Sequence, residues 1–412
     1  MGSTSATQVK RRRVFYIPGY DPFPARRYRE LYRKEGAAQA AISGYQLNML
    51  GSAAGERFGW RVRGDIDGRS TEAEIEVLVW SDIVQQSFHA SITRTYLAML
   101  RTAWIYISTG ALWRLMQLRK GPVIAALYPV VMLTWQFVFA VALGWGVGRI
   151  VQVVLAMTPI GPGFQIVLAA VVAALAFGGC LRVFQMIDGK VYAYYLMHDF
   201  AHSASRRGAY PAEIHARLQH FGTAIEAALA EEVDEVLVVG HSSGAHLAVT
   251  VLADLLRRGA VSGDGPALGF LSLGHVVPMI SFLPDAGDMR RDLRFLSTQV
   301  TIPWVDVTAP GDGCSFALCD PVAVSGQETP EKRWPLVFSA AFTQSLSPAR
   351  WQALRWRFFR LHFQYLCAFD RPKDYDYFQI TAGPLTLGAR YAGRAASASR
   401  ITRAVSKYTS IS

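Results

Sequence analysis

The sequence predicts an α/β fold with a mostly parallel sheet flanked by helices, interrupted by an inserted transmembrane helix pair. Short runs of β-branched and aromatic residues alternate with helical patterns towards both ends of the chain, which favours right-handed βαβ crossovers. Between them, residues 121–181 contain a single charged residue, Arg149. This stretch is about three times as long as the roughly 20 apolar residues that one bilayer crossing requires.

The composition agrees with a protein attached to a membrane. Of the 412 residues, 51% are hydrophobic and 18% are charged, whereas about a quarter are charged in a soluble domain. The formal net charge of +11 suits a nucleic-acid binder or a protein on an anionic membrane. The basic clusters 10–13 and 26–27 lack interleaved stacking aromatics and a recognition motif. We therefore expect a lipid bilayer as partner and no nucleic acid.

The cysteines and the N-terminus favour a reducing, cytoplasmic setting for the folded domain. The chain has only four cysteines, and residues 1–13 are polar and basic, without the apolar core of a signal peptide.

The first eighty residues are predicted to form one part of the sheet. Residues 14–17 are a strand that ends in the turn Pro18-Gly19, and helical periodicity follows from about 25 to 50. Two further strands are predicted at 60–63 and 75–80, on either side of a turn-rich segment.

Two membrane spans fit the apolar stretch, at about 123–147 and 164–184, with a break at Pro159 to Gly163. Buried helices of a large soluble core are the alternative. Residues 96–116 mix large apolar side chains with arginines, as an interfacial helix or an amphipathic core helix does. Basic residues flank the near ends of both spans, while Arg149 alone marks the far end. The positive-inside rule thus predicts an inner-membrane protein with its α/β domain on the cytoplasmic side.

The predicted organisation has four parts. They are a first α/β part (1–90), the insertion with the two spans (91–205), a second α/β part (206–390) and a basic tail, frayed or disordered (391–412). The second α/β part begins with helical periodicity at 211–231, and its strands are predicted at 233–239, 267–273, 302–307 and 335–340.

The sequence Gly240-His241-Ser242-Ser243-Gly244 matches the G-x-S-x-G nucleophile elbow. An apolar strand precedes it and a helical pattern, residues 245–257, follows it. Small residues are needed two positions before and two after the serine, because the strained turn presses these positions against the adjoining strand and helix.

In this context the chain resembles the α/β-hydrolase superfamily, over residues 14–80 and 211–366 but not over the apolar insertion. The resemblance implies that Ser242 is a nucleophile and that no metal or cofactor is used. It also implies an oxyanion hole, with one donor from the loop that contains Gly19 and Tyr20 and another from the amide of Ser243.

The resemblance further implies an acid and a histidine that follow the serine in that order. His362 is the only histidine after His275, so it is the predicted base, although it lies in a helical stretch where the family has a loop. Asp312 is the predicted acid, because it stands in a turn just after the strand at 302–307. The alternative acids are Asp306, Asp285 and Asp288.

Two metal sites are weaker hypotheses. His198 and His202 are one helical turn apart, but an aspartate stands where H-E-x-x-H peptidases have glutamate. Cys314 and Cys319 lack a second cysteine pair.

The expected activity is cleavage of a carboxylic ester, of a lipid or other long-chain substrate, through an acyl-enzyme. The same residues would serve an acyltransferase, and a membrane scaffold could retain the fold without catalysis. The sequence leaves these alternatives and the oligomeric state open.

Overall fold

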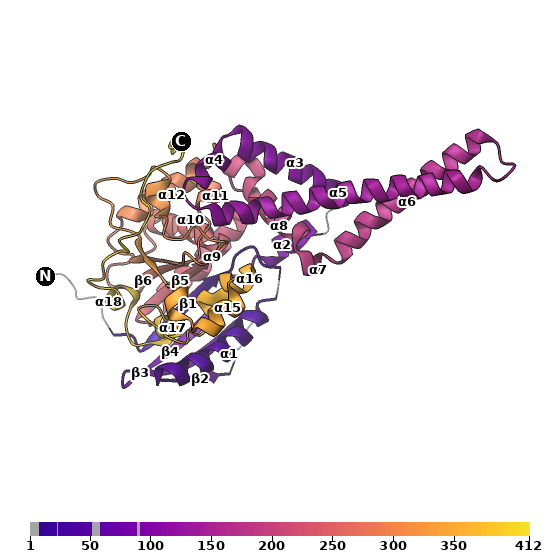
Figure 1. Cartoon of the computed structure of the whole chain (residues 1–412). Coiled ribbons are helices and arrows are strands. Elements are labelled where there is room, and N and C mark those ends of the chain that lie inside the picture. Colours follow the sequence, from indigo (N-terminus) through magenta and orange to yellow (C-terminus); the bar gives the residue numbers. More distant parts are fainter. Residues whose placement is uncertain (1–7, 23, 52–57, 89–90) are drawn as a thin grey trace. The chain divides into compact units, whose positions relative to one another are not determined.

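The protein is described by a computed structural model that covers residues 8–22, 24–51, 58–88 and 91–412. An eight-stranded sheet is its central element (Figure 1). The strands lie in the order β2-β3-β4-β1-β5-β6-β7-β8. Their bounds are β1 Arg11–Ile17, β2 Gln46–Leu50, β3 Gly59–Ile66, β4 Arg69–Val77, β5 Glu235–His241, β6 Ala267–Leu273, β7 Trp304–Thr308 and β8 Leu336–Ser339.

The sheet is mixed but mostly parallel. β4, β1, β5, β6, β7 and β8 pair in parallel, whereas β3 pairs antiparallel with both β2 and β4. The turn between β3 and β4 consists of Asp67 and Gly68, both with positive φ, which a two-residue hairpin turn of type I′ requires. This confirms the predicted α/β class with a mostly parallel sheet.

Helices cover both faces of the sheet (Figure 1). α9 and α10 pack against β5 and α12 packs on α10, while α1 and α17 lie on the opposite face. The helices of this part of the chain have the bounds α1 Arg26–Ser43, α9 Ala212–Leu229, α10 Ser243–Arg257, α11 Pro278–Ser281, α12 Gly287–Thr298, α13 Pro321–Val324, α14 Phe342–Ser345, α15 Pro348–Leu354, α16 Phe358–His362, α17 Tyr377–Ala382 and α18 Leu387–Arg390, with 3₁₀ turns η1 Ser205–Gly208 and η2 Phe363–Leu366.

The chain divides into two compact units. The first, which we call the sheet unit, comprises Met1–Gln85, Tyr106–Val123 and Ala204–Ser412. The second, the hairpin unit, comprises Gln86–Ile105 and Ile124–Ser203. The remaining helices belong wholly or partly to the hairpin unit or lead into it: α2 Ser81–Phe88, α3 Ile92–Ser108, α4 Ala111–Met116, α5 Lys120–Leu155, α6 Pro162–Met186, α7 Asp188–Val191 and α8 Ala193–Ala204.

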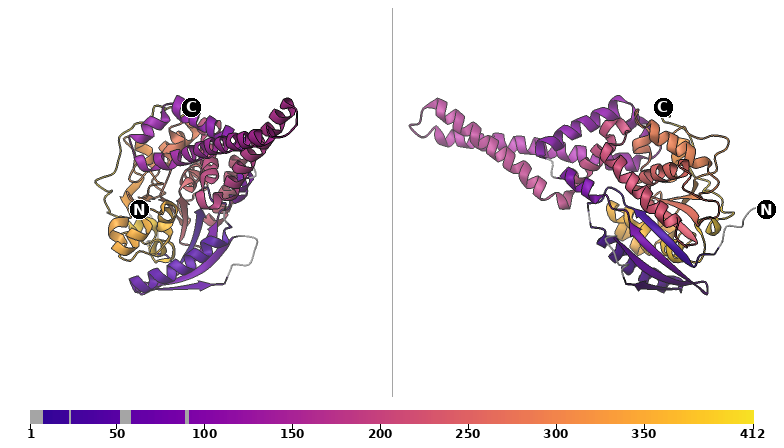
Figure 2. Two further views of the ribbon diagram at one scale, coloured as in Figure 1. Left: turned by 45° about the vertical axis from the view of Figure 1, so that its right-hand side comes forward. Right: turned by 180° about the vertical axis from the view of Figure 1, so that it is seen from behind.

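An inserted pair of long apolar helices, α5 and α6, runs side by side in the hairpin unit (Figure 2). Among the described residues they are the helices long and apolar enough to cross a membrane. Gly144 and Gly148 of α5 allow close contact with α6, because a Cβ atom added at either would lie within 3.0 Å of Ala173. Small residues four apart permit this approach in apolar helix pairs.

Two predicted elements were wrong in part. The helix predicted to continue to residue 50 ends at Ser43, because Gly44 adopts φ 74° and residues 46–50 pair with β3. The tail predicted to be frayed or disordered follows an ordered, non-helical path from Tyr391 to Ser412. The amide of Ile401 bonds the carbonyl of Leu318, and the amide of Ser397 bonds that of Val337, so the tail is held to the sheet unit by its backbone.

Candidate active site

Ser242 occupies the turn between β5 and α10, at the carboxyl edge of the parallel strands. Its backbone has φ 57° and ψ −121°. A non-glycine residue rarely adopts a positive φ, and the strain costs on the order of 1–3 kcal/mol. The surrounding structure must impose this conformation, which is the geometry expected of a nucleophile elbow.

The two glycines of the motif are required by packing. A Cβ atom at Gly240 would lie 2.7 Å from the Cα of Ala245, on the helix that follows. A Cβ atom at Gly244 would lie 2.0 Å from the carbonyl oxygen of Ile17 and 2.7 Å from that of Pro18. The elbow is therefore in tight backbone contact with the loop that follows β1.

That loop carries the predicted oxyanion donors. β1 pairs with β5 so that Ile17 is opposite Gly240, and a Cβ atom at Gly19 would lie 2.9 Å from that of Ser242. The indole of Trp80 holds the loop, because its Nε1 donates to the carbonyl of Pro18 at 2.9 Å and its ring packs edge-on against Tyr20. Ser243 is the first residue of α10, where amides have no intrahelical acceptor.

The predicted acid and base are in direct contact. Asp312, in the loop after β7, accepts a hydrogen bond from Nδ1 of His362 at 2.8 Å, and both side chains are buried. An ionised carboxylate only accepts, so Nδ1 must carry the proton. The neutral imidazole then has its lone pair on Nε2, which has no hydrogen-bond partner among the described residues.

Asp312 receives two further hydrogen bonds. The amide of Cys314 donates to Oδ1 at 2.9 Å, and the hydroxyl of Tyr365 donates to Oδ2 at 3.0 Å. Burial by itself raises the pKa of Asp312. The positive charge that His362 carries when protonated, its hydrogen bond and the amide of Cys314 outweigh burial and hold the pKa below its ordinary value. The carboxylate is therefore ionised at neutral pH.

Two backbone contacts join His362 to the elbow. The amide of Ser242 donates to the carbonyl of Leu273 at 2.9 Å. The residue after Leu273 is Gly274, and a Cβ atom added there would lie 3.1 Å from Cε1 of His362. His241, which precedes the serine, contacts the carbonyl oxygen of His362 through Nε2 at 3.0 Å. The structure thus brings Ser242, His362, Asp312 and Gly19 together at one edge of the sheet.

His241 and Tyr365 were not predicted as members of the site. The rings of His241 and His362 have centroids 4.7 Å apart. Burial, and secondly repulsion from His362 when that residue is protonated, lowers the pKa of His241 to about 3. His241 is therefore neutral at pH 7 and donates through Nε2. Tyr365 stands three residues after His362, on the same face of a helical turn, and this spacing was the available signal.

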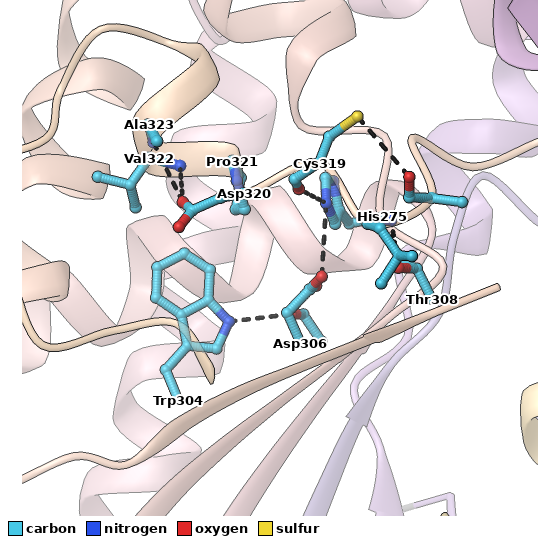
Figure 3. A network of polar contacts seen from close by, with 12 residues as sticks. His275, Trp304, Asp306, Thr308, Cys319, Asp320, Pro321, Val322 and Ala323 are labelled. Carbon is cyan, nitrogen blue, oxygen red and sulfur yellow. Dashed lines mark hydrogen bonds and ion pairs between the residues drawn. The ribbon is translucent and has the colours of Figure 1, made fainter. Parts of the chain in front are cut away.

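The alternative site residues lie in other networks. His275 donates from Nε2 to the carbonyl of Cys319 at 3.0 Å and lies 3.6 Å from Oδ2 of Asp306 (Figure 3). Asp306 accepts from the hydroxyl of Ser272 at 2.5 Å, and burial raises its pKa well above the ordinary value. Asp285 and Asp288 are exposed and pair with Arg207 and Arg291, respectively.

One group of side chains has the composition of a metal site. Donor atoms of Asp312, Cys314 and His362 lie within 4.8 Å of one another. A metal held there would have to replace the hydrogen bond between His362 and Asp312. His198 of the other predicted pair lies 3.3 Å from the hydroxyl of Thr95 through Nε2, and burial lowers its pKa.

Comparisons of this chain with protein-family models, with curated proteins and with solved structures find no match.

Proposed function

We propose that the protein is a membrane-attached serine hydrolase that cleaves a carboxylic ester. The observation that carries the proposal is the buried hydrogen bond from His362 Nδ1 to Asp312, made by a histidine that packs against the elbow of Ser242. A strained serine, a histidine with its Nε2 lone pair available and an ionised carboxylate are the three groups that activate a serine for acyl transfer.

The reaction has two halves. Nε2 of His362 takes the hydroxyl proton of Ser242 as Oγ attacks the ester carbonyl, and the same proton then passes to the departing alcohol oxygen, which leaves an acyl-enzyme. Water attacks the acyl-enzyme with His362 again as the base, which releases the acid and restores the serine. Asp312 keeps the imidazole in the required tautomer and stabilises the imidazolium.

The negative oxygen of each tetrahedral intermediate needs fixed donors. Backbone amides serve well because they do not have to reorganise, and removing one such donor costs about 100- to 1000-fold in kcat. The close approach of Gly19 to Ser242 supports the amides of Gly19 or Tyr20 as one donor, and that of Ser243 as the other.

The arrangement supports the resemblance to α/β-hydrolases. The nucleophile, acid and histidine follow β5, β7 and β8 in that order, as in the superfamily. One departure remains, because His362 ends a short helix, α16, and does not stand in a plain loop.

We propose that α5 and α6 cross a membrane. Large apolar side chains on these helices are exposed, among them Trp145 (71%) and Leu175 (70%), which argues against buried core helices. One side of α5 packs within the hairpin unit, since Leu133 is fully buried and its carbonyl accepts from Tyr96 at 3.1 Å, whereas Ile124 and Val131 are more than 60% exposed. The predicted spans, 123–147 and 164–184, both lie within these helices. A 25-residue span rises roughly 38 Å at 1.5 Å per residue, enough to cross the ~30 Å hydrocarbon core.

The charges around the hairpin support a cytoplasmic sheet unit. Three basic residues lie just before α5 or at its first position: Arg114, Arg119 and Lys120. Arg182, near the end of α6, and Lys190, after it, lie where the chain leaves the hairpin, while Arg149 alone lies near the turn that connects the two helices. Both ends of the hairpin lead back to the sheet unit, so the chain crosses an even number of times. A hydrolase in this position would act on a lipid or another long-chain ester at the inner membrane.

The test is turnover of a series of carboxylic esters by the detergent-solubilised full chain and by Ser242→Ala. We expect wild-type turnover with a preference for long acyl chains, and a loss of several orders of magnitude in kcat for Ser242→Ala. Ester products in the presence of added alcohols would make the protein an acyltransferase. Equal rates for the two proteins would overturn the proposal.

A further inference from the structure

A segment of interleaved arginines and aromatic residues lies immediately before His362, the candidate base. Residues 355–360 read Arg-Trp-Arg-Phe-Phe-Arg, and His362 follows two positions later. Trp356 is 73% exposed and Phe358 is 49% exposed, and the three arginine side chains are exposed as well. We call Arg355, Trp356, Arg357, Phe358 and Arg360 the Arg–aromatic patch.

The positive charges of the patch are not neutralised by any residue that the structure describes. No described residue forms an ion pair with Arg355, Arg357 or Arg360, and the guanidinium of Arg355 lies 5.5 Å from the ring centroid of Trp356. Other exposed arginines do have partners, as Arg258 does with Glu226 at 2.9 Å. Exposed tryptophan beside uncompensated arginine is the side-chain chemistry of a membrane interface, where the ring enters the headgroup layer and the cations meet anionic lipid.

The patch is joined to the acid loop and to the first turn of α5. A Cβ atom at Gly313 would lie 3.2 Å from the ring of Phe358, and one at Gly121 would lie 3.1 Å from the Cα of Gly313. Arg119 also donates from Nε to the carbonyl of Ala317 at 2.7 Å. All of these contacts are within the sheet unit. The acid loop that holds Asp312 is thus packed between the patch and the residues that begin the first apolar helix.

We propose that the Arg–aromatic patch binds the anionic headgroups of the bilayer that α5 enters, and so presents the site of Ser242 to esters lying in that bilayer. The inference rests on the proposed function and adds its substrate class: amphiphilic esters whose ester bond lies at headgroup depth. The patch packs next to the start of α5, whose first residue is Lys120. This position favours a lipid surface over a nucleic acid as its binding partner.

The experiment uses the full chain reconstituted in vesicles of phosphatidylcholine, with or without phosphatidylglycerol. Hydrolysis of a long-chain ester embedded in the vesicles is compared with hydrolysis of a short, water-soluble ester. The test variant is Arg355→Gln/Arg357→Gln/Arg360→Gln. The control, Arg333→Gln/Arg400→Gln/Arg403→Gln, removes the same charge from exposed arginines elsewhere on the sheet unit.

We expect phosphatidylglycerol to lower the KM of the wild-type protein for the embedded ester, and salt to reverse the effect. The patch variant should lose this response. Its KM for the embedded ester should exceed that of the wild type by roughly fivefold or more, because a single arginine near an anionic surface increases partitioning by about that factor. Its turnover of the soluble ester should stay unchanged, and the control variant should behave as the wild type does.

A second measurement does not depend on catalysis. Brominated phosphatidylglycerol should quench tryptophan emission more in the wild type than in Trp356→Phe. Absence of all esterase activity would remove the proposed function, while quenching at Trp356 would still uphold the membrane contact. An intact lipid response in the patch variant, no quenching difference at Trp356, or patch-dependent binding of duplex DNA in place of vesicles would overturn the inference.

Discussion

Tyr365 shares the carboxylate oxygen of Asp312 with His362. A hydrogen bond to a charged group contributes about 1.5–3 kcal/mol, and here it fixes the oxygen on which the imidazole depends. We expect Tyr365→Phe to lower kcat about tenfold with little change in KM, measured by steady-state hydrolysis of a soluble ester. Tyr365 would then be a positioning residue.

A matched control for this substitution is Tyr45→Phe. The hydroxyl of Tyr45 also donates to a buried carboxylate, that of Asp376 at 3.0 Å, away from the candidate site. This variant should lose stability and keep its kcat. Equal effects of the two substitutions on kcat would contradict the role assigned to Tyr365.

His241 makes the stability of the protein depend on pH. Its pKa falls to about 3 in the folded chain from an ordinary value of 6.5, because burial penalises the imidazolium. Between these values the unfolded chain binds the additional proton, so the free energy of unfolding falls as the pH falls from 6.5 towards 3. The slope from this residue is at most about 1.4 kcal/mol per pH unit.

Denaturant unfolding of His241→Gln at several pH values measures this contribution. We expect a shallower decline of the unfolding free energy below pH 6.5 than in the wild-type protein. Parallel curves for the two proteins would show that His241 does not stay neutral in the folded state.

The candidate site was predictable where its signals are local. Ser242 stands in a five-residue motif between a strand and a helix, and Asp312 stands in a turn at the end of a strand. His362 could be predicted as the base because no other histidine follows His275 in the sequence. His241 was inside the motif, but its bond to the carbonyl of His362 joins residues 121 positions apart. No sequence pattern encodes such a contact.

At the scale of elements, the elbow and the loop after β1 form one packed structure. The Cβ atom of an alanine at position 244 would overlap the carbonyl oxygens of Ile17 and Pro18. Overpacking of this kind costs about 1–3 kcal/mol, and it would push the oxyanion loop away from Ser242. We expect Gly244→Ala to lower both the melting temperature and kcat, measured by thermal unfolding and ester hydrolysis.

Gly263→Ala provides the control for that substitution. No described atom lies within 4 Å of the added Cβ, and Gly263 does not have a positive φ. This variant should resemble the wild-type protein in both measurements. A fully active Gly244→Ala would mean that the tight contact with Ile17 does not constrain the loop.

The elements that the sequence failed to predict have physical reasons. β2 is a five-residue edge strand, Gln-Leu-Asn-Met-Leu, without a β-branched residue. It begins two residues after Gly44, whose positive φ ends α1. The tail is rich in alanine, serine and arginine, a composition typical of disorder, and it is ordered here by backbone hydrogen bonds to Leu318, Val337 and Val324. Such bonds leave no pattern of side chains in the sequence.

For the molecule as a whole, we propose that the hairpin anchors the protein in a membrane. An apolar pair of helices joined at both ends to the sheet unit should behave as an integral membrane segment. We expect alkaline carbonate to leave the protein in the membrane pellet. Release into the supernatant would make α5 and α6 a lid or a contact between copies of the chain.

Orientation is a separate prediction. Ile160 lies in the turn between α5 and α6, so a membrane-impermeant maleimide applied to intact cells should label Ile160→Cys. The wild-type protein, with its four native cysteines, is the control and should stay unlabelled until the cells are opened. Labelling of both proteins in intact cells, or of neither, would contradict a cytoplasmic sheet unit.

The presence of an apolar insertion was predictable from its composition alone. Which side of α5 is covered was not predictable, because residues 123–147 are apolar all round. Contacts within the hairpin unit decide this, as at Leu133.

The proposed hydrolase activity requires Ser242 to be an activated nucleophile. The most direct measurement is labelling of the purified full chain with a fluorophosphonate probe, followed by mass spectrometry of the modified peptide. We expect a single modification, at Ser242, which Ser242→Ala abolishes without loss of fold and His362→Ala slows by several orders of magnitude. Labelling of Ser242→Ala at the wild-type rate, or no labelling of a folded wild-type protein, would contradict it.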